Sequence, residues 1–248
     1  MKTNYCNALI NLFFPNLCLF DGRRINDKEI PCVCGSCLKK INFISSFVCS
    51  KCGSPMHNHK YSDDIIVGDL KFTCKKCAEN KFWFRFLRSA CYYEGITRDC
   101  IRLFKYKQKF ALKKICALLL MYAFRTHFAR ETYDLIMAVP MHPLKKFIRE
   151  YNHSEVLAKE FSFIAGIHYA GRNLKRIKIT KSQTGLNSIN RKRNVQNAFS
   201  VSSREEIRGK KILLIDDVAT TLNTANECAK TLFKNGAEFI DVLTIARG

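Results

Sequence analysis

The sequence is short of acidic residues, and its charge is therefore strongly unbalanced. Its 248 residues hold 21 Asp and Glu against 42 Lys and Arg, a formal charge of +21. A positive field of that size favours phosphate-rich partners such as nucleic acids, phosphorylated metabolites or an anionic membrane face. A lysine-biased surface without a special partner is the alternative, although the basic residues cluster in 174–181 and 191–193.

The sequence also lacks an apolar run long enough to cross a bilayer. Its apolar start, residues 1–20, is interrupted by Asn7, Asn11, Pro15 and Asn16. This start predicts a short amphipathic helix, and we expect neither a transmembrane segment nor a secretory signal. We therefore expect a cytoplasmic, reducing environment, where paired cysteines serve as metal ligands more often than as disulfides.

Most of the 13 cysteines lie before residue 80, and many form C-x2-C pairs. Two such pairs can offer four thiolates to one tetrahedral zinc ion. Cys49 and Cys52, together with Cys74 and Cys77, form the strongest metal signal in the chain. Gly53 follows the first pair, where a tight turn commonly needs a positive φ. Four free buried cysteines are the alternative interpretation.

A second zinc site is predicted around the remaining C-x2-C pair. Its ligands would be Cys18, Asp21, Cys34 and Cys37, with the aspartate standing where a second upstream cysteine would complete the pattern. Aspartate is an ordinary zinc ligand. Cys32 or Cys6 could replace it, and loss of the site is the other alternative. No arrangement of His, Cys and water suits hydrolytic zinc chemistry, so both sites are expected to contribute folding free energy.

From about residue 86 onward, the pattern alternates between strands and helices, which indicates a parallel α/β sheet. We predict a boundary between a helix and zinc-ribbon domain, 1–80, and an α/β domain, 81–248. Strands are expected in 89–95, 133–140, 210–215 and 239–246, and helices in 96–128, broken near 105–109, in 152–166 and after residue 221.

Two adjacent acids, Asp216 and Asp217, follow the predicted strand 210–215, and a hydroxyl-rich run then leads into a helix. Ligands bind at the carboxyl ends of strands in such sheets, and a helix N-terminus favours a phosphate. Carboxylates bind sugar hydroxyls or Mg2+. The sequence therefore predicts a ribose-phosphate site, with a plain helix cap as the alternative.

The stretch ILLIDDVATTLNT, 212–224, resembles the 5-phosphoribosyl-1-pyrophosphate (PRPP) signature of type I phosphoribosyltransferases. Together with segments 101–112, 137–161 and 174–199 and the paired cysteines, it makes the sequence similar to the ComF family of competence and DNA-uptake proteins over almost its whole length. The resemblance implies a type I phosphoribosyltransferase-like domain behind a double zinc ribbon.

The resemblance also implies which residues form the PRPP site. They are Asp216, Asp217, Ala219, Thr220, Thr221, Leu222, Asn223 and Thr224, with Val139, Pro140, Met141 and His142 as the loop that receives pyrophosphate in the enzymes. Further matches to the family's own segments are Arg149, Tyr151, Asn152, Gln183, Leu186, Arg191, Arg193, Asn194 and Phe199.

Three positions depart from the family pattern. Leu222 replaces a glycine of the phosphate loop, which costs about 1–2 kcal/mol if that residue has a positive φ, and its Cβ would crowd a phosphate. Glu150 and His153 replace the glycine and glutamine of an Arg-Gly-Phe-Asn-Gln segment, and Asp21 replaces a cysteine.

The favoured function is an accessory role in DNA uptake or recombination, handling single-stranded DNA and meeting a helicase or a recombination protein. Interleaved aromatics such as Phe104 and Phe110 could stack on bases or serve the core. The alternatives are a phosphoribosyltransferase that uses PRPP with Mg2+, and a nucleotide-sensing regulator whose zinc ribbon docks a partner. The expected nucleic-acid contacts are Lys105, Lys107, Arg149, Lys175, Arg176, Lys178, Arg191, Lys192 and Arg193.

Overall fold

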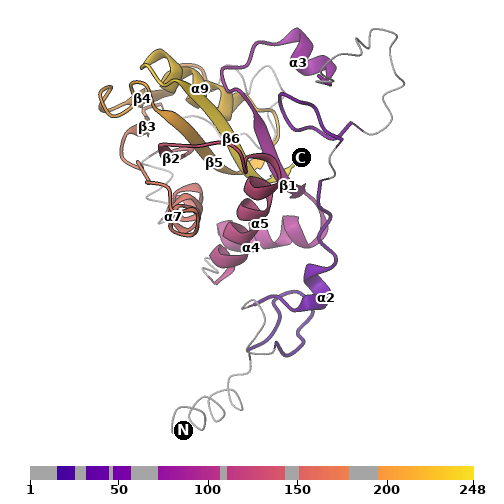
Figure 1. The fold of residues 1–248 in the computed structure, drawn as a ribbon. Coiled ribbons are helices and arrows are strands. Elements are labelled where there is room, and N and C mark those ends of the chain that lie inside the picture. The colour runs from indigo at the N-terminus through magenta and orange to yellow at the C-terminus, as the bar shows by residue number, and fades with distance from the viewer. Residues whose placement is uncertain are drawn as a thin grey trace, which may run out of the picture.

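The α/β part is built on a parallel sheet, as the sequence predicts (Figure 1). The computed structural model describes residues 16–25, 32–44, 47–56, 72–106, 111–142, 151–178 and 195–248. Four parallel strands lie in the order β1 (Leu87–Tyr92), β6 (Phe239–Arg247), β5 (Lys211–Ala219) and β2 (Leu135–Ala138). The central strands β5 and β6 are buried over most of their length, which explains their nearly continuous apolar runs.

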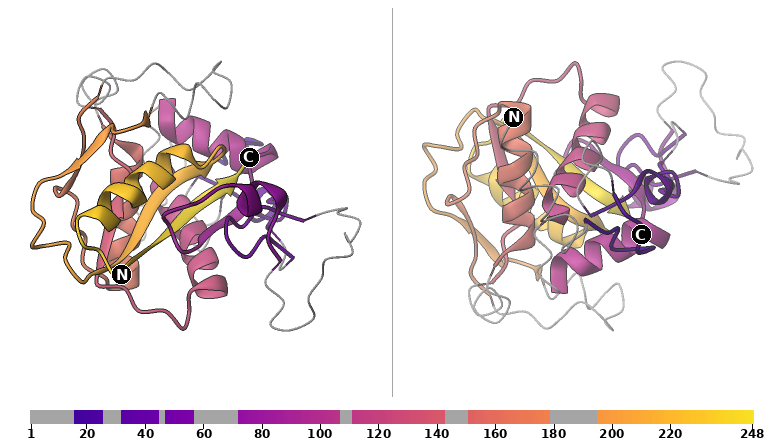
Figure 2. Two further views of the ribbon diagram at one scale, coloured as in Figure 1. Left: turned by 90° about the horizontal axis from the view of Figure 1, so that it is seen from above. Right: turned by 90° about the horizontal axis from the view of Figure 1, so that it is seen from below.

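Helices cover both faces of this sheet (Figure 2). One face carries α4 (Gly95–Tyr106), α5 (Leu112–His127) and α7 (His153–Ala165), and the other carries α9 (Asn223–Lys234). Alternate residues of β5 serve the two faces, because successive side chains of a strand point to opposite sides. Leu213 and Ile215 join the apolar cluster of α4, α5 and α7, whereas Ile212 and Leu214 join the cluster of α9. The sheet therefore separates two cores.

The cysteine-rich part lies against this domain and not apart from it. Short helices α2 (Gly35–Leu38) and α3 (Lys75–Glu79) each begin directly after a cysteine of a C-x2-C pair. Described residues between these helices lie beside β1, where Ile44 donates its N–H to the carbonyl of Ala90 at 2.9 Å and Leu87 donates its N–H to the carbonyl of Lys51 at 2.9 Å. The division at residue 80 stays a proposal, because backbone hydrogen bonds cross it.

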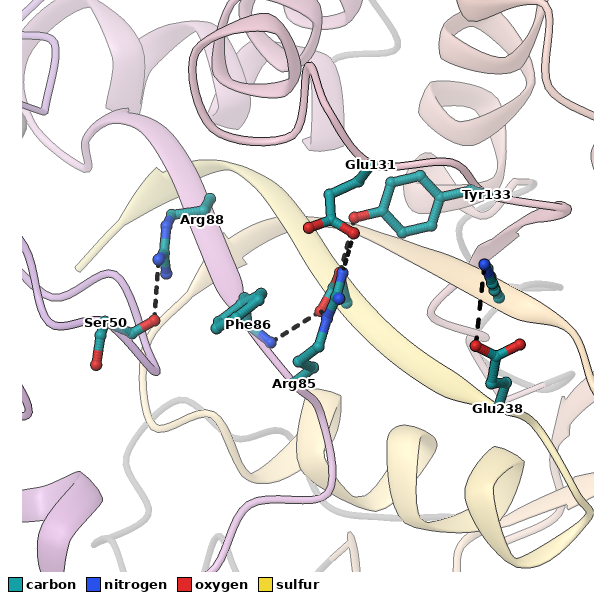
Figure 3. A network of polar contacts seen from close by, with 9 residues as sticks. Ser50, Arg85, Phe86, Arg88, Glu131, Tyr133 and Glu238 are labelled. Atoms are coloured by element: carbon teal, nitrogen blue, oxygen red, sulfur yellow. Dashed lines mark hydrogen bonds and ion pairs between the residues drawn. The ribbon is translucent and has the colours of Figure 1, made fainter. Parts of the chain in front are cut away.

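A buried charge network joins the entry of β1 to the start of β6 (Figure 3). Asp241 is fully buried and accepts hydrogen bonds from Arg85 Nη2 at 2.6 Å, Tyr133 Oη at 2.7 Å and the N–H of Phe86 at 2.9 Å. Arg85 also contacts Glu131 at 2.6 Å. Each charge has an opposite partner, as a buried charge requires. This network fixes the connection from α3 into β1.

Several details differ from the sequence prediction. A short antiparallel pair, β3 (Leu174–Arg176) and β4 (Phe199–Val201), was not expected, because three residues are too few to show a period. Strand β5 continues through Ala219, so the acid pair lies within the strand and not after it. The expected amphipathic helix in 1–20 falls mostly outside the described residues. Among the helices that the structure describes, none is both long and apolar enough to cross a membrane.

Candidate ribose-phosphate site and zinc sites

The acid pair near the end of β5 contacts α4 and α7, two of the helices that cover one face of the sheet. Asp217 is 4% exposed, and its Oδ2 lies 2.8 Å from Lys105 Nζ of α4 and 2.7 Å from His153 Nε2 of α7. Asp216 accepts a hydrogen bond from Ser154 Oγ at 2.9 Å and one from the N–H of Asp217 at 2.9 Å. The pair therefore sits at a junction of three elements.

The surroundings shift the pKa values of the two carboxyl groups in opposite directions. Burial, followed by the neighbouring charge of Asp217, raises the pKa of Asp216 to about 6. Burial alone would raise the pKa of Asp217 too, but Lys105 and His153 hold it well below its usual range. One carboxylate is thus permanently ionised, while the other takes up a proton just below neutral pH. Two adjacent carboxyl groups whose pKa values are shifted apart are typical of a ligand site.

Lys105 was predicted as a nucleic-acid contact, and the structure gives it a different position. Its side chain is 17% exposed and pairs with Asp217. Although burial lowers the pKa of Lys105, the charge of Asp217 more than offsets this and raises it. Its charge is therefore engaged inside the site and is not displayed on an open surface.

The positions of His153 and Ser154 at the acid pair were not predicted from the sequence. His153 stood out only as a departure from the family pattern, yet its Nε2 lies 2.7 Å from Asp217 Oδ2. A histidine and a serine at the start of a predicted helix were the available signal. The start of α7 is also joined to α4, because Tyr151 Oη donates a hydrogen bond to the carbonyl of Phe104. Phe104 is fully buried, so its ring belongs to the core and does not stack on bases.

The segment Val139–His142 lies at the same edge of the sheet as the acid pair. The N–H of Val139 donates to the carbonyl of Ile215 at 2.9 Å, which extends the pairing of β2 with β5. Val139 and His142 are buried, whereas Pro140 and Met141 are partly exposed. Fold topology thus brings this segment beside Asp216, as expected for the carboxyl ends of neighbouring parallel strands.

Two basic side chains, Arg247 and Lys76, donate hydrogen bonds to backbone carbonyls at the end of β5 and in the loop that follows it. Arg247 Nη1 donates to the carbonyls of Ala219 and Thr220, both at 2.7 Å. Lys76 Nζ, from the helix α3 of the cysteine-rich part, donates to the carbonyl of Thr221 at 3.1 Å. The rest of the predicted loop, Asn223 and Thr224, forms the first turn of α9. The hydroxyl-rich run therefore leads into a helix N-terminus, where a phosphate is favoured.

Leu222 has a left-handed backbone conformation, which costs free energy for a leucine but not for the glycine that it replaces. Its φ is +69°, and it is the residue from which α9 begins. Its side chain is 3% exposed and belongs to the apolar cluster on the α9 face. Burial of the side chain therefore offsets the strain of about 1–2 kcal/mol that a left-handed leucine carries.

The predicted basic contacts are only partly described. Lys175 on β3 and Lys178 just after it are exposed, and Lys178 Nζ donates to the carbonyl of Gln196 at 3.2 Å. Arg176 is half-buried, with its guanidinium carbon 5.4 Å from the centre of the Phe199 ring. The remaining cations and family positions lie outside the described residues: Lys107, Arg149, Gln183, Leu186, Arg191, Lys192, Arg193 and Asn194.

The four cysteines predicted for the stronger zinc site come together. The Sγ atoms of Cys49, Cys52, Cys74 and Cys77 all lie within 4.8 Å of one another, and those of Cys52 and Cys74 are 3.8 Å apart. A tetrahedral ion with Zn–S distances of about 2.3 Å needs a sulfur separation of about 3.8 Å. The N–H of Cys74 also donates to Cys49 Sγ at 3.3 Å, which favours a thiolate there. The donor set fits zinc.

Gly53 is required directly after this site. Its φ is +62°, as predicted, and a Cβ atom there would lie 2.5 Å from the carbonyl oxygen of Leu87. The knuckle can approach β1 this closely only with glycine.

The second predicted ligand set also comes together, aspartate included. The ligand atoms of Cys18, Asp21, Cys34 and Cys37 lie within 4.8 Å of one another. Asp21 Oδ2 is 3.2 Å from Cys34 Sγ and 3.3 Å from Cys37 Sγ. A hydrogen bond from the N–H of Arg23 is the largest cause that lowers the pKa of Asp21. An ionised carboxylate beside three thiols is a donor set that fits zinc, and the group includes neither Cys32 nor any other described residue.

Comparisons with known proteins agree with both halves of this description. The family model of the double zinc ribbon domain matches residues 9–78. A search of the solved structures matches an adenine phosphoribosyltransferase from Thermoanaerobacter pseudethanolicus, at 12% identity and a TM-score of 0.37, covering 58% of this chain and 84% of that one. The double zinc ribbon and the parallel sheet of the predicted fold class are confirmed by the family model and by the strand order.

Relatives along nearly the full length give the family. The DNA utilization protein YhgH of Escherichia coli K12 is 27% identical over 206 residues, 81% of this chain and 84% of the relative. Competence protein F of Haemophilus influenzae is 31% identical over 224 residues, 86% of this chain and 96% of the relative. With 31% identity along most of both chains, the chain belongs to the ComF family of Competence protein F.

Proposed function

We propose that this protein handles single-stranded DNA during DNA uptake and carries a ribose-phosphate site at the junction of β5 and α9. The relationship to Competence protein F along 86% of the chain is the observation that carries the proposal. A shared name alone says nothing of mechanism. The physical support comes from the charge of the chain and from the geometry of the acid pair.

The DNA surface would be basic and would contact phosphates. The formal charge of +21 is far larger than solubility requires, and Lys175 and Lys178 lie exposed on and beside the short hairpin of β3 and β4. Contacts to phosphates release counterions and make binding salt-dependent without reading the base sequence. A single strand also offers unstacked bases, so it should bind better than a duplex of equal length.

The DNA proposal is tested by removing two phosphate contacts. Lys175→Gln combined with Lys178→Gln should weaken binding of an oligo-dT and lower the slope of log K against log salt by about 1.4, or about 0.7 per contact. A matched control is Lys113→Gln with Lys159→Gln, which removes the same charge from α5 and α7, where both lysines pair with glutamates at 3.0 Å. Equal slopes in the two double variants would show that the hairpin is not the contact surface.

The ribose-phosphate proposal rests on the acid pair beside a helix N-terminus. Asp216 would accept hydrogen bonds from ribose hydroxyls, and the first turn of α9 would receive the phosphate. If PRPP binds with magnesium, Asp216 is the carboxylate suited to the ion, because the charge of Asp217 is balanced by Lys105 and His153. The double variant Asp216→Asn with Asp217→Asn should abolish binding of ribose 5-phosphate measured by calorimetry. Undiminished affinity would mean that the loop is only a helix cap.

Location and partners follow from the same proposal. We place the protein in the cytoplasm, where an incoming strand would meet a helicase or a recombination protein. The double zinc ribbon offers a small rigid surface for such a partner.

Turnover of PRPP is the second candidate function, and one observation favours it. The loop retains the left-handed residue at position 222 although glycine is replaced, so the backbone form of the phosphate loop survives. Release of pyrophosphate from PRPP in the presence of a panel of nucleobases would establish this activity, and its absence would leave the site with a binding role.

A further inference from the structure

The zinc site formed by Cys49, Cys52, Cys74 and Cys77 makes direct contact with the ribose-phosphate loop. Lys76 stands between two of its ligands, in the first turn of α3. Its Nζ donates to the carbonyl of Thr221, a residue 145 positions further along the chain, at 3.1 Å. The orientation of Lys76 is therefore determined by a knuckle that the metal would hold together.

Lys76 completes a row of three restrained carbonyls. Arg247 holds the carbonyls of Ala219 and Thr220, and Lys76 holds that of Thr221. In a trans peptide the C=O and the N–H of one plane point to opposite sides. The N–H groups of Thr220, Thr221 and Leu222 therefore point away from the two cations. Consecutive N–H groups turned to one side form a concavity that suits an anion.

The segment that leaves α3 of the zinc ribbon also packs along α9. Trp83, shortly after α3, donates its N–H to Asn226 Oδ1 at 2.7 Å, and its ring packs on Phe233 with centroids 5.4 Å apart. Leu222 is buried in the apolar cluster that contains Cys49 and Cys52. The loop is thus tied to the zinc knuckle at Thr221 by a hydrogen bond and at Leu222 by packing in one apolar cluster.

We propose that this zinc knuckle positions the amide groups of the ribose-phosphate loop, with Lys76 as the positioning residue. Loss of its contact frees the peptide plane between Thr221 and Leu222, and the ordered row of donors is lost with it. The consequence for ligand affinity rests on the proposed ribose-phosphate site. The consequence for the loop itself does not, because amide exchange can be followed without any ligand.

The first experiment compares two neighbouring lysines by hydrogen exchange in the full chain. Lys76→Met should speed exchange of the Asn226 amide, which donates to the carbonyl of Leu222 at 2.8 Å, by about threefold to tenfold, as expected for loss of one hydrogen bond from a partly exposed charged donor. Lys75→Met is the matched control, because its side chain is 86% exposed and pairs only weakly with Glu79 at 3.9 Å. Lys76→Arg should restore slow exchange. Equal zinc content in all variants shows that the knuckle is intact.

The second experiment measures ribose 5-phosphate affinity in the same variants. A loss of about threefold to tenfold in Lys76→Met, with Lys75→Met unchanged, supports the coupling. If the parent binds and the exchange rates of the two methionine variants are equal, the coupling is wrong while the site stands. If exchange differs and no variant or parent binds the sugar phosphate, the coupling stands and the ribose-phosphate proposal is wrong.

Discussion

The two zinc sites use nearly the same ligands but serve different parts of the molecule. Cys18, Cys34 and Cys37 of the site with Asp21 belong to the apolar cluster of α4, α5 and α7. Cys49 and Cys52 of the four-cysteine site belong to the cluster of α9, and its knuckle also contacts the loop after β5. Similar ligand chemistry therefore has different consequences, because the elements packed against each knuckle differ. The site with Asp21 supports one core, and the four-cysteine site supports the other core and the loop after β5.

Removing one ligand from each zinc site should show how the two sites differ. Of the changes considered, this one should have the largest effect on zinc content and amide exchange. Cys74→Ser and Cys37→Ser should each cost one zinc ion per chain, because three remaining ligands bind the metal far more weakly. Only Cys74→Ser should speed exchange of the Asn226 amide, by more than about tenfold, since it releases both Lys76 and the packing around Leu222. Elemental analysis and hydrogen exchange check the two halves. Similar exchange of this amide in the two variants would contradict the difference.

Breaking the network around Asp241, which fixes the connection from α3 into β1, gives the next largest effect and leaves every zinc ligand in place. Asp241→Ala leaves Arg85 and Tyr133 without their buried partner, and it should lower the free energy of unfolding by about 3–5 kcal/mol. Glu131→Gln is the control, because this glutamate is 32% exposed and its loss should cost about 1 kcal/mol. Denaturant titration measures both. Retention of zinc by folded Asp241→Ala would show that this network and the metal contribute separately.

The adjacent acids should respond to pH with opposite signs. The pKa of Asp216 is raised, so its ionised form costs stability that grows as pH rises from about 4 to 6. Asp216→Asn should therefore gain on the parent over that range, by about 2–3 kcal/mol at 1.36 kcal/mol per pKa unit. The pKa of Asp217 is lowered, so its carboxylate stabilises above pH 4 and this contribution is lost on acidification.

Asp217→Asn is accordingly most destabilising at neutral pH. Chemical denaturation of both variants at pH 4, 5, 6 and 7 tests the pair. If the free energies of unfolding of the two variants changed with pH in parallel, the environments of Asp216 and Asp217 would be alike, in disagreement with the contacts of Asp217 to Lys105 and His153.

The smallest expected effect concerns Leu222. Leu222→Gly removes the left-handed strain, about 1–2 kcal/mol, but also removes a buried side chain worth about 2–4 kcal/mol. The net loss of stability should be about 1–2 kcal/mol, with faster exchange in the loop. Leu222→Asn keeps more left-handed preference than other side chains and separates strain from burial. Higher stability, or tighter ribose 5-phosphate binding, in the glycine variant would show that leucine obstructs the site.

Local spacing was enough to predict the ligands and the class of fold. Both candidate zinc ligand sets, including Asp21 in place of a cysteine, follow from pairs of residues with two other residues between them. The parallel sheet follows from alternating strand and helix patterns, and the acid pair from its position at the end of an apolar run. These features are readable because they depend on neighbours within a few residues along the chain.

Tertiary structure alone decided how these parts meet. The pairing of Lys105 and His153 with Asp217, the burial of Leu222 and the contact of Lys76 with Thr221 join segments that are distant in sequence. In the sequence, a lysine that would face DNA and a lysine that pairs with a buried carboxylate look alike. The choice is made when the sheet and the ribbons pack, because burying a charge is favourable only where packing also brings its partner.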